Sequence, residues 1–153
     1  MSGLEALGVA ASVIQVADLG TKLSVKLFSF YRQFKNADES FQLLSNEVAL
    51  TSAILRELGD NLKDEKLSKL CSDEAFQILE RVLDQCRDVL KQIERLVGTN
   101  AQSSKTRVKQ AIGKVRLVLL EPSLNPLKTN LERLKSTMLL LLNVIMFAGQ
   151  VRK

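Results

Sequence analysis

The feature that most constrains this chain is the stretch from Leu4 to Phe34, which contains no proline. Its polar side chains recur at steps close to three and four, so on a helix they form one narrow polar stripe. Nearly every other position around the cylinder is apolar or small. A helix of this kind must be covered by other helices or placed in lipid. The polar positions are Glu5, Ser12, Gln15, Asp18, Lys22, Lys26, Ser29 and Gln33.

The rest of the chain repeats apolar residues at alternating steps of three and four, which is typical of helices packed along a seam. Ser72 is suited to cap a helix, Gly98 to end one, and Pro126 to begin one after a break at Glu121–Pro126. We expect helices at about 3–34, 38–62, 73–97, 106–120 and 126–149. The predicted seams are Phe41, Leu44, Val48, Thr51, Leu55, Leu58 and Leu62; Phe76, Leu79, Leu83, Cys86, Leu90, Ile93 and Val97; and Leu127, Leu131, Leu134, Met138, Leu141, Ile145 and Ala148.

Helices of this length joined by short loops predict an all-α fold, an antiparallel helical bundle of four to five helices that forms one domain over residues 1–153. The first and last helices are the most apolar, so we expect them to pack against each other at the centre. From Met138 onward the apolar residues spread around the last helix, which predicts burial on most sides. Asn143 should then bond across to the first helix or face a solvated edge.

The composition argues against an enzyme. The chain has no His, which removes the commonest general base and the commonest metal ligand. We find no nucleotide-binding glycine motif and no nucleophile motif, and we expect no cofactor and no metal. Cys71 and Cys86 have a spacing that fits no zinc motif, so we interpret them as reduced core or boundary residues of an intracellular protein.

Positive charge is concentrated in the last third of the chain, where residues 105–153 hold ten Lys/Arg and two Asp/Glu. An ordinary soluble surface, a site for anionic lipid and a site for an acidic protein partner all fit this cluster. Nucleic acid fits poorly, because aromatic residues are not interleaved with the cations. The basic patch is Lys105, Arg107, Lys109, Lys114 and Arg116.

No segment has the form of a signal peptide. The longest runs without charge, Ala6–Ala17 and Ser136–Val151, are shorter than the roughly 18 to 20 residues that span a bilayer. We therefore expect a soluble, cytoplasmic resting protein. The small residues of the first helix allow two interpretations, which are close packing in the core and self-association in or near a membrane.

Four segments, in order, resemble a fungal N-terminal helical domain found at the head of STAND-type NTPases and other multidomain fungal proteins, a domain related to the HeLo-like family. The segments are LGVAASVIQVADLG, LLSNEVALTSAILRELGDNL, CRDVLKQIERL and NLERLKSTMLLLLNVIMFA. They span essentially the whole chain. The resemblance implies that residues 1–153 are the N-terminal domain of a longer protein.

The resemblance also implies a non-enzymatic effector or signalling domain of fungal regulated cell death. Such a domain oligomerises when a sensor protein activates it, and it targets membranes through its N-terminal helix. Here that helix maps onto the residues Leu4, Leu7, Gly8, Val9, Ala11, Val13, Ile14 and Val16. The alternative is a homotypic or heterotypic protein–protein interaction module without membrane activity. The expected partners are the chain itself, an activating sensor, and anionic lipid on activation.

Overall fold

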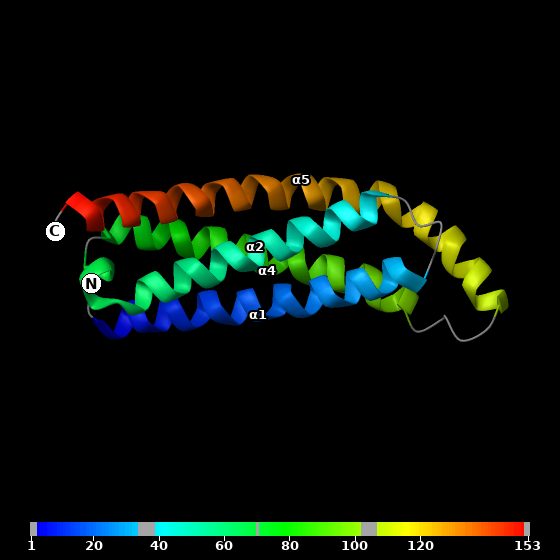
Figure 1. Ribbon diagram of the computed structural model, residues 1–153, viewed down its shortest axis with the longest axis horizontal. Helices are drawn as coiled ribbons and strands as arrows, with labels where there is room; N and C mark the ends of the chain where they lie inside the picture. The colour runs from blue at the N-terminus through cyan, green and yellow to red at the C-terminus, as the bar shows by residue number, and fades with distance from the viewer. Residues whose placement is uncertain (1–2, 34–38, 70, 102–106, 152–153) are drawn as a thin grey trace.

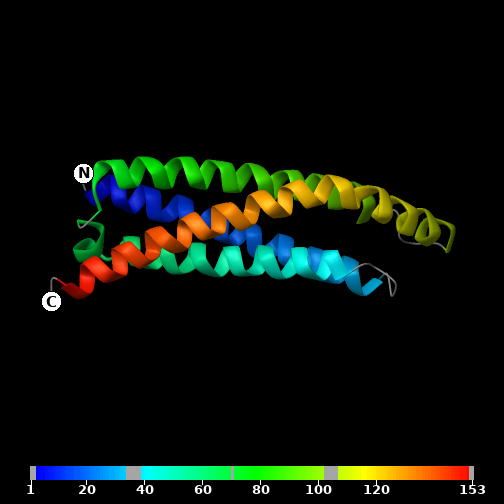
Figure 2. The ribbon, with the colours of Figure 1, turned by 90° about the horizontal axis from the view of Figure 1, so that it is seen from above.

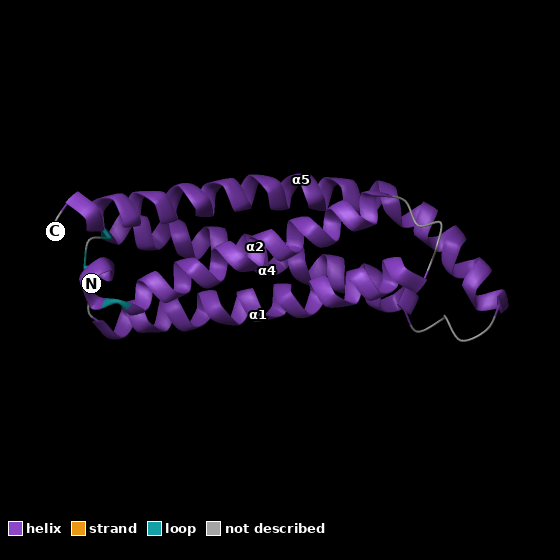
Figure 3. Cartoon of the chain, in the orientation of Figure 1, coloured by secondary structure: helices purple, strands orange, loops and turns teal. Residues whose placement is uncertain are grey.

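A computed structural model describes residues 3–33, 39–69, 71–101 and 107–151, with side chains at 5–29, 42–64, 66, 68–69, 71–96 and 122–147. The helices are α1 (Gly3–Gln33), α2 (Glu39–Lys63), α3 (Glu65–Ser68), α4 (Asp73–Ala101) and α5 (Arg107–Val151). The four long helices run alternately in opposite directions (Figure 1). The described residues form no strand (Figure 3). The expected all-α bundle is therefore confirmed.

The core follows the bundle axis and is lined by residues spaced as the sequence predicts. Burying these side chains supplies the main driving force for folding, because each large aliphatic chain removed from water contributes about 1.5–3 kcal/mol. The buried seam residues are Leu44, Val48, Thr51, Leu55, Leu58 and Leu62 on α2; Phe76, Leu79, Leu83, Cys86, Leu90 and Ile93 on α4; and Leu131, Leu134, Met138 and Ile145 on α5.

The closest helix pair is α1 with α2, and small residues allow the close approach. A Cβ atom added at Gly59 would lie 2.7 Å from Cγ1 of Ile14, and one added at Gly20 would collide with Oγ of Ser52. Ser45 Oγ also donates a hydrogen bond of 3.3 Å to the backbone oxygen of Ser24. Among the small residues in the N-terminal half of the first helix, Ala6, Ala10 and Ala17 are buried, which fits the core-packing interpretation for these three.

The first and last helices do not pack on each other as expected. Among the described residues, α1 packs on α2 and α4, and α5 packs on α4 and α2. Seen from above, α5 lies over α2 and α4 while α1 lies behind them (Figure 2). The reason is that apolar content does not select a partner helix, whereas the small residues of α1 fit the facing surface of α2.

The expected break at Glu121–Pro126 is also wrong, because α5 is one helix of 45 residues that contains Pro122 and Pro126. Each proline removes a backbone donor and costs a helix interior about 3 kcal/mol. Leu124, between the two prolines, is buried, so packing on the bundle opposes that cost. The helix changes direction in this region, and its N-terminal part extends beyond the other helices (Figure 1).

Two connections differ in detail from the prediction. The expected end at Gly98 is not found, because α4 continues to Ala101, and a glycine costs a helix only about 1 kcal/mol. The segment between α2 and α4 contains the short helix α3. The Ser72 cap is confirmed, since its Oγ accepts a hydrogen bond of 3.1 Å from the backbone N–H of Ala75.

One ion pair joins α2 to α5 across the bundle. Nζ of Lys135 lies 2.5 Å from Oε1 of Glu47, and both side chains are largely buried. This contact does not have the angular geometry of a hydrogen bond, and Oε1 is otherwise unpartnered. The lysine therefore supplies the charge that compensates a carboxylate removed from water.

We predict opposite effects for alanine at two helical glycines. Gly59→Ala should lower the free energy of unfolding by on the order of 1 kcal/mol, because the new methyl group overlaps Ile14. Gly8→Ala should raise it by about 0.5–1 kcal/mol, because a Cβ atom there has nothing within 4 Å. Urea denaturation of both variants measures the difference, and changes of the same sign would contradict the packing described for α1 and α2.

We predict that Lys135→Met lowers the free energy of unfolding by about 1.5–3 kcal/mol, since it leaves the Glu47 carboxylate buried without a cation. Adding Glu47→Gln to that variant should recover part of the loss. The pair of half-buried Lys128 and exposed Glu132, at 3.9 Å, is the control, and Glu132→Gln should change stability by less than about 0.5 kcal/mol because that carboxylate is in water. Equal losses at the two pairs would rule out a special role for the α2–α5 pair.

Candidate functional site

The residues predicted to form a membrane and assembly face on the first helix do not share one face of α1. Val9, Val13 and Val16 are buried in the core. Leu7, Gly8 and Ala11 are exposed, and Ile14 is half-buried against Gly59. Leu4 lies on α1, but its side chain is outside the described residues. In the resting fold, half of the predicted face is therefore used to hold the bundle together.

The polar stripe of α1 faces solvent as predicted, apart from Ser12, which is half-buried, and Gln33, whose side chain is not described. Asp18 accepts a hydrogen bond of 2.9 Å from Arg56 of α2, and the same guanidinium donates to Thr21 at 3.2 Å. An exposed pair of this kind stabilises a fold by less than about 1 kcal/mol. In the resting fold Asp18 thus forms a surface contact between α1 and α2.

One helix among the described residues is long and apolar enough to cross a membrane, and it is the Glu5–Ser29 part of α1, with a mean hydropathy of 1.2. Residues that are buried inside the bundle make up 44% of it. The core helix of a soluble protein has the same properties, so the length and composition of α1 are weak evidence for membrane insertion.

The basic patch lies on the N-terminal part of α5 and in the connection before it. Arg107, Lys109, Lys114 and Arg116 belong to α5, but their side chains are outside the described residues, and Lys105 lies outside them altogether. The three interpretations of this patch, a soluble surface, a lipid site and a protein site, stay predictions.

The C-terminal half of α5 is not buried on most sides, as the sequence analysis expected. Among the described residues, α5 packs on α2, α4 and the short helix α3, and the side turned away from them faces solvent. Asn143 is exposed there, as the solvated-edge alternative predicted. At 100° per residue the exposed apolar positions span about 160° of the helix. We call them the α5 outer face: Leu139, Leu140, Val144, Met146 and Phe147.

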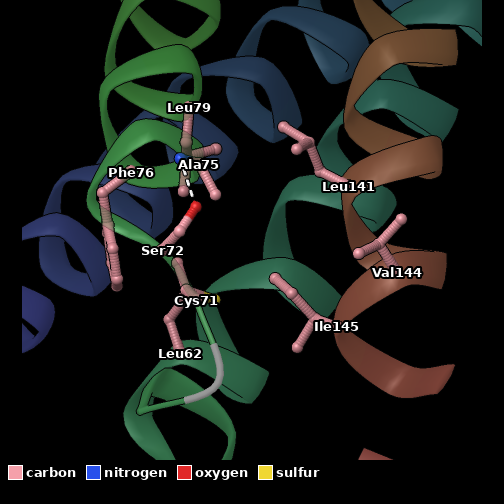
Figure 4. Close-up of a pocket in the computed structure, with 9 residues that line it drawn as sticks. All are labelled: Leu62, Cys71, Ser72, Ala75, Phe76, Leu79, Leu141, Val144 and Ile145. Carbon is pink, nitrogen blue, oxygen red and sulfur yellow. Dashed lines mark hydrogen bonds between the residues drawn. The ribbon is translucent and has the colours of Figure 1, made fainter. Parts of the chain in front are cut away.

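An apolar pocket borders the α5 outer face at the end of the bundle that holds both termini. It has a volume of about 140 Å³. Val144 belongs both to the pocket wall and to the α5 outer face. In Figure 4, side chains of α5 face the start of α4 across the pocket. We call it the end pocket, and its walls are Leu62, Cys71, Ser72, Ala75, Phe76, Leu79, Leu141, Val144 and Ile145.

The end pocket is suited to hold an apolar group and offers little reactive chemistry. None of its lining residues is charged, and the Ser72 hydroxyl caps α4. Burial raises the pKa of the Cys71 thiol above its ordinary value, so the thiol is protonated at neutral pH and is a weak nucleophile. An apolar cavity of about 150 Å³ in another protein takes up benzene. The end pocket thus has room for a single ring or one large side chain.

The end pocket was not predicted from the sequence. Its only available signal was the small size of Cys71, Ser72 and Ala75 at the start of a helix whose later seam positions are large. Cys86 lies deeper in the core, as expected for a small core residue, and burial raises its pKa to about 12.

A second hollow lies between α1 and α4 and is polar. It has a volume of about 450 Å³, and Glu5, Glu80, Asp84 and Arg87 are among its lining residues. Arg87 lies 3.4 Å from Asp84 and balances part of the negative charge. Within the described part of the chain, no group of three or more His, Cys, Asp or Glu side chains is arranged to hold a metal ion. Gly8 lies on the wall of this hollow, and a Cβ atom added there would meet nothing within 4 Å.

Comparisons with known proteins give one match. No curated protein and no solved structure matches the chain. A family model described as "Pigment biosynthesis cluster protein PigL N-terminal" matches residues 4–152. This match supports the coarser part of the resemblance, a helical N-terminal domain of fungal type, and does not extend to HeLo-like or STAND-type proteins. Because the match spans nearly the whole chain, the chain belongs to the family of the PigL N-terminal domain.

Proposed function

We propose that this domain is a non-enzymatic protein-interaction module, and that it docks its partner on the α5 outer face. The partner we propose is a protein that presents an apolar helix face of its own. The supporting observation is that five large apolar side chains are exposed along one side of one helix. Monomeric soluble proteins seldom leave so many apolar side chains together in water unless the surface binds something.

Charge favours a protein over lipid as the occupant. Helices that lie on anionic membranes carry Lys and Arg beside their apolar face. The sequence from Ser136 to Val151 has no charged residue. The end pocket beside the α5 outer face adds a recess for one apolar side chain, as protein-interaction hot spots often have.

We predict that a photo-reactive amino acid at Leu140, placed in the protein in its own cells, forms an adduct with another protein molecule. The adduct should disappear when Val144→Asp is added, because a charge in the middle of the α5 outer face opposes docking. Mass spectrometry of the adduct identifies the partner. The same photo-reactive residue at Gln92, an exposed position on α4, is the control. Adducts with lipid alone, or no more adduct than at Gln92, would overturn the proposal.

A second candidate is the membrane effector of regulated cell death that the resemblance implies. The observation in its favour is that Glu5–Ser29 of α1 meets the length and composition of a membrane span. In this mechanism α1 leaves the bundle, and Val9, Val13 and Val16 exchange the core for lipid. The domain is cytoplasmic at rest and meets the membrane only after activation.

We predict that a disulfide between α1 and α2 blocks membrane activity if this second mechanism operates. Ser24→Cys with Ser45→Cys is suitable, because the Ser45 hydroxyl lies 3.3 Å from the backbone oxygen of Ser24. Each protein is clustered by a fused oligomeric tag and added to dye-filled liposomes that contain anionic lipid. The oxidised double variant should leave the liposomes intact, and reduction of its disulfide should restore dye release. The two single substitutions, Ser24→Cys and Ser45→Cys, are the controls, and they also test whether Cys71 or Cys86 takes part in oxidation. Leakage that persists in the oxidised form, or no leakage by the unmodified clustered protein, would exclude a mechanism in which α1 is released.

A further inference from the structure

The α5 outer face and the end pocket lie side by side, so this chain carries both a projection and a recess for it. Phe147 is 67% exposed and Leu140 is 64% exposed. Val144, one helical turn before Phe147, is 58% exposed and also forms part of the pocket wall. We propose that two copies of this chain pair through α5 in antiparallel orientation, with Phe147 of each copy seated at the end pocket of the other. This inference rests on the proposed function and names the partner.

The helical spacing of these residues fits a two-fold axis. In an antiparallel pair whose axis passes between Asn143 and Val144, Phe147 of one copy lies opposite Leu140 of the other. The two Asn143 side chains then lie close to the axis, where their amides can bond to one another. A polar side chain inside an apolar helix interface fixes the register in this way.

The charges of the surface are compatible with self-pairing. A two-fold axis brings identical residues together, so any charged residue near the axis meets its own copy. The segment from Ser136 to Val151 holds no Asp, Glu, Lys or Arg, so pairing along it brings no like charges into contact. The ion pair of Lys135 and Glu47 lies inside the bundle and is not disturbed.

The exposed area matches what a weak specific dimer requires. Large side chains carry on the order of 150–250 Å² of accessible surface, so the five residues of the α5 outer face present roughly 500 Å² per copy at their observed exposures. If all of this area is covered, two copies bury roughly 1,000 Å² in total, which is the lower limit for a specific interface. The recess adds complementarity of shape, because its volume of about 140 Å³ suits one aromatic ring.

Sedimentation velocity of the full chain over a range of concentrations tests this pairing. The protein should dimerise, and Phe147→Ser should weaken the dimer by on the order of 10- to 100-fold. Phe28→Ser is the matched control, since Phe28 is 48% exposed on α1, a helix that among the described residues does not pack on α5, and this variant should dimerise like the unmodified chain.

Ala75→Leu provides a second variant that fills the end pocket and leaves Phe147 in place. It should weaken the dimer while the circular dichroism and the unfolding midpoint stay close to those of the unmodified chain. A chain that stays monomeric up to its solubility limit would overturn the inference. A dimer whose dissociation constant is changed neither by Phe147→Ser nor by Ala75→Leu would also overturn the inference.

The two proposals can fail separately. If the Leu140 adduct contains a different protein and the chain is monomeric, the interaction function stands and self-pairing is wrong. If the adduct contains only lipid, both proposals fail.

Discussion

The contact between α1 and α2 is the constraint on which the rest of the bundle depends. Gly20 and Gly59 bring the two helices so close that a methyl group at either position would meet the facing side chain. This closeness places Val13 and Ile14 against α2 and leaves α4 to cover the other flank of α1. The two middle helices, α2 and α4, then have one side each left for α5. The bundle is therefore built from a tight pair with α4 and α5 added, and α5, like each of the other long helices, packs on two long neighbours.

Cover from these neighbours on one side alone leaves the most apolar segment of the sequence only half-buried. The sequence from Met138 to Phe147 is apolar around almost its whole circumference, with Asn143 as its one polar residue. Periodicity located the inward positions Leu131, Leu134 and Met138 correctly, because burial inside one chain imposes a repeat. The apolar composition of the segment led to the wrong environment for Leu140 and Val144. Composition does not show whether an apolar side chain is covered by its own chain or by another molecule.

The other differences between sequence and structure have local causes. Glu121–Pro126 carries every local signal for a helix end and a new start, yet Leu124 packs on the bundle and the helix continues. Tertiary packing overrides a local conformational preference of a few kcal/mol when packing contributes more to the free energy of folding. Ser72, by contrast, caps α4 as predicted, because its signal depends only on residues next to it in the chain. The end pocket could not be predicted, because it depends on where the end of α5 meets the start of α4.

The same packing decides which function is accessible from the resting fold. Releasing α1 would expose Val9, Val13, Val16, Leu23 and Leu27 together with their partners, a loss on the order of 10 kcal/mol. Domains of this size are stable by only about 5–15 kcal/mol, so releasing α1 is close to unfolding the domain unless lipid or an oligomer replaces the lost contacts. The α5 outer face needs no such step, because it is exposed already. Docking through α5 can therefore act in the folded protein, and any membrane step through α1 requires an input of free energy from outside the domain.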